Sequence, residues 1–196
     1  MSKSLRELKL KDVFYGAIVP LIIGLIIIAF PISEELLSQV NPALIGIFVF
    51  GIAEMIMTVG APIILGLLWN KWAGGASGFL LGSIFALWYA IYGLDTPGWI
   101  HDVSLLGYIV SAMMIGYIAG ALNSRSQSFS RLLFSGFTAA LVGALFLFTA
   151  FQFSPLHLAT GFLGFFITVV SRITIGIITP ALAKFFLRYQ QSPLQS

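Results

Sequence analysis

The 196-residue chain is 59% apolar and only 9% charged, whereas soluble domains are roughly 45–50% apolar and about 25% charged. A chain of this composition cannot cover its surface with polar groups in water, and its length leaves no room for a separate catalytic or nucleotide-binding domain. Its formal net charge is +3 and it has no cysteine, which excludes disulfides, thiolate metal sites and cysteine nucleophiles.

Six apolar runs follow one another along the chain, each at least about as long as the ~20 residues that cross a bilayer as a helix. The runs lack the strict alternation of membrane β-strands, and helices satisfy their backbone groups internally in hydrocarbon. We therefore predict an all-α, polytopic membrane protein with a single membrane domain. The predicted spans are 13–31, 43–69, 76–94, 103–122, 132–153 and 160–187, with tails at 1–12 and 190–196.

Apart from Arg172, lysine and arginine lie in alternate connecting segments or near the two ends of the chain. They occur in the N-terminal tail, in the loops 70–75 and 123–131, and near the C-terminal end of the last run. The loops 33–42 and 95–102 carry acidic residues but no lysine or arginine. By the positive-inside rule both termini are predicted to be cytoplasmic, in a multi-pass protein of the cell (plasma) membrane.

Two charged residues lie deep inside apolar runs, Glu54 in the second and Arg172 in the sixth. Each is about eleven residues from the outer end of its predicted helix, so the rise of ~1.5 Å per residue puts them at similar depth. Small or hydroxyl-bearing residues share their helix faces, namely Gly51, Thr58 and Ala61 for Glu54 and Gly161, Thr168, Gly176, Thr179 and Ala183 for Arg172.

We predict that Glu54 and Arg172 form an ion pair, because either charge alone would be costly in hydrocarbon. Two interpretations of the pair stay open at this point. It fixes the register of two helices without binding anything, or it forms a ligand-orienting or proton-linked site.

Small residues at four-residue spacing recur in several runs and predict close helix packing. Proline inside a run predicts a kink. The small-residue seams are Gly16–Pro20–Gly24, Gly78–Gly82, Gly116–Gly120 and Gly136–Ala140–Gly143, and the internal prolines are Pro20, Pro62 and Pro180.

Aromatic residues gather near the outer end of the third run and in the loop that follows it. Tyr89, Tyr92, Trp99 and His101 form either an interfacial aromatic belt or one wall of a ligand pocket. Trp99 suits the belt. Tyr89 suits the pocket better, because it shares a face with Gly78, Gly82, Phe85 and Tyr92.

The sequence contains no nucleophile elbow, phosphate-binding loop or zinc-protease motif. The two histidines, His101 and His157, lie in outer loops without partners at metal-ligand spacing apart from the adjacent Asp102. We therefore expect no enzyme activity, no metal site, no cofactor and no nucleic-acid partner.

The stretches GGASGFLLGSIFALWYAIYG at 74–93 and MMIGYIAGALNSRSQSFSRLLFSGFTAALVGAL at 113–145 are glycine-rich, and a basic cytoplasmic loop interrupts the second. In these features, which cover about half of the chain, the protein resembles the substrate-binding S components of energy-coupling-factor (ECF) vitamin transporters. The resemblance implies six helices, ATPase and transmembrane coupling subunits as partners, and a vitamin-like ligand captured from the outer side.

The predicted function is accordingly the substrate-binding membrane subunit of a small-molecule uptake transporter. One alternative is a standalone channel or secondary transporter for a small organic anion, and another is a non-transporting scaffold subunit of a larger membrane complex. The predicted ligand-binding residues are Glu54, Tyr89, Tyr92, Trp99, His101 and Arg172.

Overall fold

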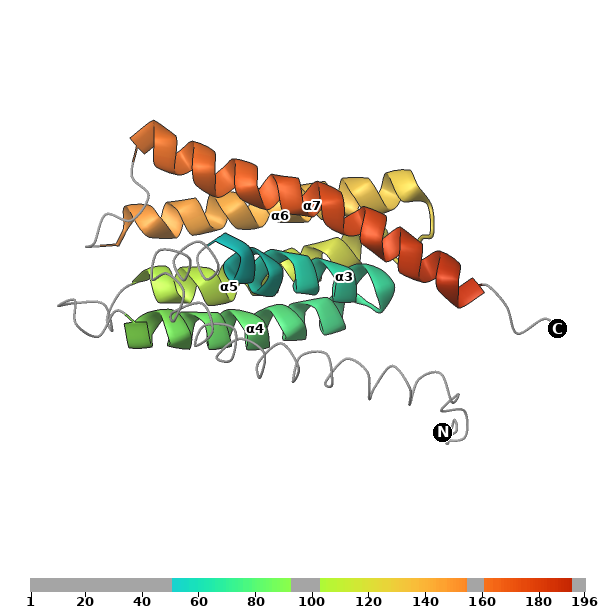
Figure 1. Ribbon diagram of the computed structural model, residues 1–196, viewed down its shortest axis with the longest axis horizontal. Coiled ribbons are helices and arrows are strands. Elements are labelled where there is room, and N and C mark those ends of the chain that lie inside the picture. The colour runs from blue at the N-terminus through green and yellow to red at the C-terminus, as the bar shows by residue number, and fades with distance from the viewer. Residues whose placement is uncertain (1–50, 93–102, 155–160, 192–196) are drawn as a thin grey trace, which may run out of the picture. The chain divides into compact units, whose positions relative to one another are not determined.

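The computed structural model describes residues 51–92, 103–154 and 161–191, and every regular element in these ranges is a helix. Residues 51–55 are helical and lead directly into the first labelled element. The elements are η2 (Ile56–Gly60), α3 (Ala61–Leu68), α4 (Lys71–Tyr92), α5 (Val103–Asn123), α6 (Phe129–Gln152) and α7 (Gly161–Gln191) (Figure 1).

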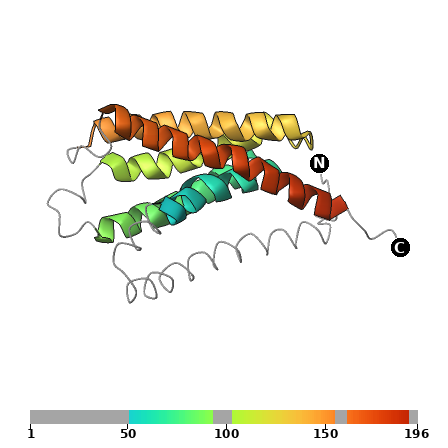
Figure 2. The same cartoon turned by 45° about the horizontal axis from the view of Figure 1, so that its top comes forward.

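Five helical segments of the described residues are long and apolar enough to cross a membrane. They are Gly51–Leu68, Lys71–Ala90, Val103–Asn123, Phe129–Gln152 and Gly161–Arg188. They run side by side in both views (Figures 1 and 2). The predicted all-α class is thus confirmed for this part of the chain, whereas the predicted first span, 13–31, and the tail 1–12 lie outside the described residues.

Polar and apolar side chains are distributed differently from those of a water-soluble bundle, because large apolar side chains cover the surface while polar side chains lie within an otherwise apolar interior. The interior holds hydroxyl-bearing side chains such as Thr58, Ser111 and Thr168, each at most 5% exposed. The outer surface carries large apolar side chains, among them Phe162 at 82% exposure and Leu163 at 69%. Apolar residues facing outward and small or polar residues facing inward are what lipid favours. This distribution, in helices long and apolar enough to cross a bilayer, is typical of a helical membrane protein.

The turn between α3 and α4 is shorter than the sequence predicts. The interval 70–75 was predicted to be a loop, but α4 already begins at Lys71. The side chain of Asn70 caps this helix, because its Oδ1 accepts hydrogen bonds from the backbone N–H groups of Trp72 and Ala73, both at 2.9 Å. An asparagine cap satisfies otherwise unpaired donors at a helix start, so the helix extends five residues further back than predicted.

The predicted loop 123–131 is likewise shortened, because α6 begins at Phe129. Ser124 and Arg125 make the turn with φ values of 46° and 62°. Side chains then tie this turn to its neighbours: Asn123 Nδ2 donates to the carbonyl of Leu67 at 3.1 Å, and Lys184 Nζ donates to the carbonyl of Gln127 at 2.6 Å. The ends of α3, α5 and α7 and the start of α6 therefore meet at one end of the bundle.

Glycines bring α4 and α5 into backbone contact. A Cβ added to Gly74 would come closer than 3.0 Å to backbone atoms of Gly116, and one added to Gly78 would do the same at Ala112. Gly120 approaches the backbone of Lys71 in the same way. The predicted close packing is confirmed at these positions, because no side chain larger than hydrogen fits between the two helices.

Glycines also allow close contact between α6 and α7. A Cβ on Gly136 would clash with Gly176 O and the Pro180 ring, and one on Gly176 would clash with the Ala140 side chain. The predicted seam in the first run, Gly16–Pro20–Gly24, lies outside the described residues.

Two adjacent glycines of α4 provide a matched test of this packing. Gly74→Ala should lower the free energy of unfolding by about 1–3 kcal/mol, because the new methyl group overpacks the contact with Gly116. Gly75→Ala should be neutral or stabilising, because its Cβ would meet Tyr117 at an ordinary 3.5 Å and alanine favours the helix by up to ~1 kcal/mol. Reversible unfolding in mixed micelles measures both, and equal effects of the two substitutions would contradict the packing described.

Candidate functional site

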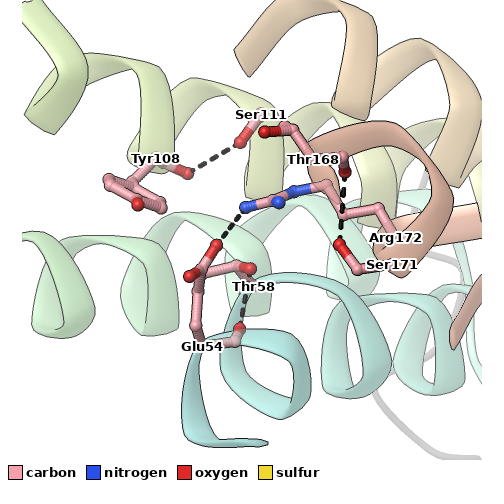
Figure 3. A network of polar contacts seen from close by, with 7 residues as sticks. All are labelled: Glu54, Thr58, Tyr108, Ser111, Thr168, Ser171 and Arg172. Carbon is pink, nitrogen blue, oxygen red and sulfur yellow. Dashed lines mark hydrogen bonds and ion pairs between the residues drawn. The ribbon is translucent and has the colours of Figure 1, made fainter. Parts of the chain in front are cut away.

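An ion pair between Glu54 and Arg172 lies at the centre of the described helices. Arg172 Nη2 donates a hydrogen bond to Glu54 Oε1 across 118 positions of sequence (Figure 3). Glu54 is 6% exposed and Arg172 only 2%, which makes Arg172 the largest fully buried side chain of the described residues. The ion pair predicted from the sequence is therefore confirmed.

The position of Arg172 along α7 puts this pair well inside the span. Arg172 is eleven residues from Gly161, about 16 Å at ~1.5 Å per residue, in a candidate span that continues to Arg188. Because Glu54 is hydrogen-bonded to it, the carboxylate lies at the same depth. The site thus consists of two opposite charges far from either end of the spanning segment.

The backbone around Glu54 is not a regular α-helix. Residues 51–53 and Ile56–Gly60 adopt π-helical turns, and Glu54 and Met55 lie between the two stretches. The wide turn ends at Ala61, whose N–H bonds to the carbonyl of Ile56, and Pro62 follows at the start of α3. Proline has no N–H and its ring clashes with the carbonyl four residues earlier in an α-helix, so the wider turn accommodates Pro62. Such π-helical turns occur frequently at functional sites.

Hydroxyl groups surround the pair, but their protons are used within their own helices. Thr58 Oγ1 donates to the carbonyl of Glu54 at 2.8 Å, and Ser111 Oγ donates to that of Tyr108 at 3.2 Å. Ser171 Oγ donates to the carbonyl of Thr168 at 3.4 Å. Figure 3 shows the guanidinium reaching from α7 to Glu54 among these residues.

The predicted small-residue faces are largely those that are buried. On the Arg172 face Thr168, Gly176, Thr179 and Ala183 are buried, and on the Glu54 face Thr58 is buried and Ala61 half-buried. The prediction was wrong for the two glycines at the helix beginnings, because Gly51 and Gly161 are exposed. Gly161 starts α7 with a φ of +78°, a conformation that glycine adopts readily, so its role is in the turn.

Arg172 uses only part of its hydrogen-bonding capacity on Glu54. A guanidinium that pairs side-on with a carboxylate donates from two nitrogens at once. Here Nη2 is bonded to Glu54, whereas the buried Nε has no hydrogen-bond partner among the residues that the structure describes. A buried donor left unpaired costs about 1–3 kcal/mol. The site therefore has a donor available for a further acceptor at the position of the buried charge.

Tyr89 lies in a buried aromatic cluster formed by Phe85, Tyr89, Tyr108 and Phe151. The ring of Tyr108 is 5.0 Å from that of Phe85, 5.4 Å from that of Tyr89 and 5.7 Å from that of Phe151, measured between centroids. Tyr89 is 6% exposed, so it points inward as the pocket interpretation requires and is not part of a lipid-facing belt.

The remaining predicted ligand residues are not brought into this site by the described structure. Trp99 and His101 lie outside the described residues, and only the backbone of Tyr92, the last residue of α4, is described. Their roles stay predictions.

Sequence reasoning missed Tyr108 and Ser111, which extend from α5 beside the ion pair (Figure 3). A signal for them exists. They share a helical face with small residues that are also buried, namely Ser104, Gly107, Ala112, Gly116, Ala119 and Gly120. A tyrosine among so many small residues on one face has to lie inside the bundle, because that face packs against other helices.

Within the part of the chain that the structure describes, no group of three His, Cys, Asp or Glu side chains is arranged to hold a metal ion. In comparisons with known proteins, no family model, curated protein or solved structure matches the chain.

Proposed function

We propose that this protein is a small-molecule transport protein that binds its substrate at the Glu54–Arg172 pair inside the membrane. The observation that carries the proposal is the buried pair itself, in which the Nε of Arg172 has no acceptor within the described helices. Ionisable residues within membrane spans are rare and expensive, and they commonly mark substrate or ion pathways. A pair that only fixed the helix register would be most stable if Nε and Nη2 of Arg172 both donated to the Glu54 carboxylate.

The proposed topology is six spans with both termini in the cytoplasm of a cell (plasma) membrane protein. Apart from Arg172, the lysine and arginine side chains of the described helices and turns lie at one end of the bundle, here called the basic end. It consists of Lys71, Arg125, Arg131, Lys184 and Arg188. Since basic residues favour the cytoplasmic side, the basic end faces the cytoplasm.

Reporter fusions test this topology. Fusions after Asn123 and Gln190 should report a cytoplasmic location, and fusions after Gln39 and Ser154 an external one, because the basic residues retain their side of the membrane. An external signal after Asn123 would overturn the proposed orientation.

Two forms of transporter are compatible with the site. The resemblance to S components favours a substrate-binding subunit that takes up a vitamin-like ligand with ATPase and coupling subunits. The ion pair favours a standalone transporter, because a carboxylate beside a substrate-binding guanidinium can couple movement of an anion to movement of a proton without ATP. Uptake by the purified chain alone in liposomes separates the two forms.

Ligand-dependent thermal stabilisation tests the proposal itself. The purified protein is screened against small organic acids, amines and neutral vitamin-like compounds, because a ligand that binds the folded state raises the melting temperature. At least one compound should do so in the wild type and in Arg188→Gln, which removes an exposed charge from the same helix. The shift should be lost in Arg172→Lys, which keeps a positive charge but not the planar fork of donors.

A panel in which no compound gives a shift that depends on Arg172 would contradict binding at this site. A shift that survives in Arg172→Lys and in Arg172→Gln would place the ligand elsewhere and would also count against it.

A further inference from the structure

We propose that the substrate is a small monocarboxylic acid, and that its carboxylate replaces Glu54 as the partner of Arg172 while Glu54 takes up the acid's proton. This inference rests on the proposed function and adds the substrate class and the exchange. It starts from the geometry of the pair. One guanidinium nitrogen is bonded to the Glu54 carboxylate, and one buried nitrogen has no partner in the described part of the chain.

A carboxylate is the ligand that fits the free part of this guanidinium. Arginine recognises carboxylates by two parallel N–H···O bonds. With Glu54 held by Nη2 alone, a second carboxylate can approach through Nε and then compete for Nη2. Arg172 would repel a cationic ligand. A neutral amide would accept hydrogen bonds from the buried guanidinium but would lack the charge attraction that a carboxylate adds.

Charge balance requires the proton. Among the described residues, Arg172 from α7 is the charged group that faces Glu54, and Tyr108 of α5, with Tyr89 of α4 behind it, supplies phenol groups. The nearest described basic residue on α7, Lys184, is twelve residues further along, about 18 Å of helix. If an anion entered without a proton, three charges would share the buried site and leave it with a net charge of −1, which a low-dielectric interior strongly disfavours.

The exchange is balanced when the substrate enters as the acid. The O–H bond of R–COOH breaks, a new O–H bond forms on the Glu54 carboxylate, and R–COO⁻ pairs with the Arg172 guanidinium. The net charge of the site is zero before and after the step. The same end state arises when the anion enters with a proton from water, so binding of the anion consumes one proton in either case.

The residues around the Glu54–Arg172 pair suit a small acid with an apolar tail. Thr58, Ser111 and Thr168 are small and buried, and the ring of Tyr108 leads from the pair into the aromatic cluster with Phe85 and Phe151. A short aliphatic or aromatic monocarboxylate combines the charge that Arg172 needs with a tail that the aromatic cluster tolerates.

Calorimetric titration of the purified protein with propionate and benzoate tests the exchange, with propionamide and benzamide as neutral controls. Titrations in two buffers of different ionisation enthalpy count the protons taken up. We expect about one proton per carboxylate bound and an affinity that increases roughly tenfold per unit decrease of pH while Glu54 is charged in the free protein. The amides should bind weakly and without proton uptake.

Glu54→Gln is the decisive variant, because glutamine mimics the neutral acid and does not compete for Arg172. Its affinity for the carboxylates should be at least about tenfold higher than that of the wild type. The reason is that the Glu54–Arg172 pair no longer has to be broken before Arg172 can bind the ligand. Its binding should consume no proton and depend little on pH. Arg172→Gln should not bind carboxylates, and the Glu54→Gln result stands by itself if Arg172→Gln does not fold.

The outcomes separate this inference from the proposed function. Carboxylate binding without proton uptake, or unchanged affinity in Glu54→Gln, overturns the exchange. Binding of amides or amines that depends on Arg172, with no binding of carboxylates, overturns the substrate class and leaves the proposed function intact. Absence of any binding that depends on Arg172, across all these compounds, overturns both.

Discussion

A charge inside hydrocarbon has to be neutralised or paired, and this requirement governs the centre of the protein. Glu54 and Arg172 are both almost completely buried, and each is the other's partner. Such a pair does not stabilise a fold merely by existing, because the cost of removing both charges from water can exceed their mutual attraction. Once one member is present, however, the other is required. The helical segment around Glu54 is therefore held to α7 at a fixed depth.

The rest of the bundle brings these two residues together by close backbone contact. Gly74 and Gly78 on α4 meet α5, and Gly136 on α6 meets Gly176 on α7. Helices that approach so closely leave little room for large side chains at these contacts, and many large apolar residues are directed outward. In lipid this arrangement gains packing without a hydrophobic driving force between helices. Among the buried polar side chains, Thr58, Ser111 and Thr168 lie near the pair (Figure 3).

Sequence reasoning was most successful where a physical penalty left few solutions. Two charges in apolar runs at equal depth had to find each other, and glycines at four-residue spacing had to allow close contacts. Both predictions were confirmed. The inward direction of Tyr89 followed from the face that it shares with Gly78 and Gly82, and it was confirmed as well.

Other features left weak or no traces in the pattern of apolar residues. The beginning of α4 was predicted too late because the charged Lys71 is typical of a loop between two apolar runs. In the structure Asn70 caps a helix that begins with Lys71. The π-helical turns around Glu54 change the hydrogen-bond register without changing hydrophobicity, so that only Pro62 hints at them. Tyr108 was overlooked because an isolated tyrosine in an apolar run stands out only when its whole face is considered.

A double-mutant cycle on Glu54→Gln and Arg172→Gln measures the central claim most directly. Each single substitution should destabilise the protein by about 3–5 kcal/mol, because it leaves one buried charge without a partner. Water that reaches the unpaired charge reduces this cost. The double substitution removes both charges and should cost clearly less than the sum of the two, giving a coupling energy of about 0.5–3 kcal/mol or more. Additive effects, with no coupling between the two positions, would mean that Glu54 and Arg172 do not meet in the membrane and would contradict the account.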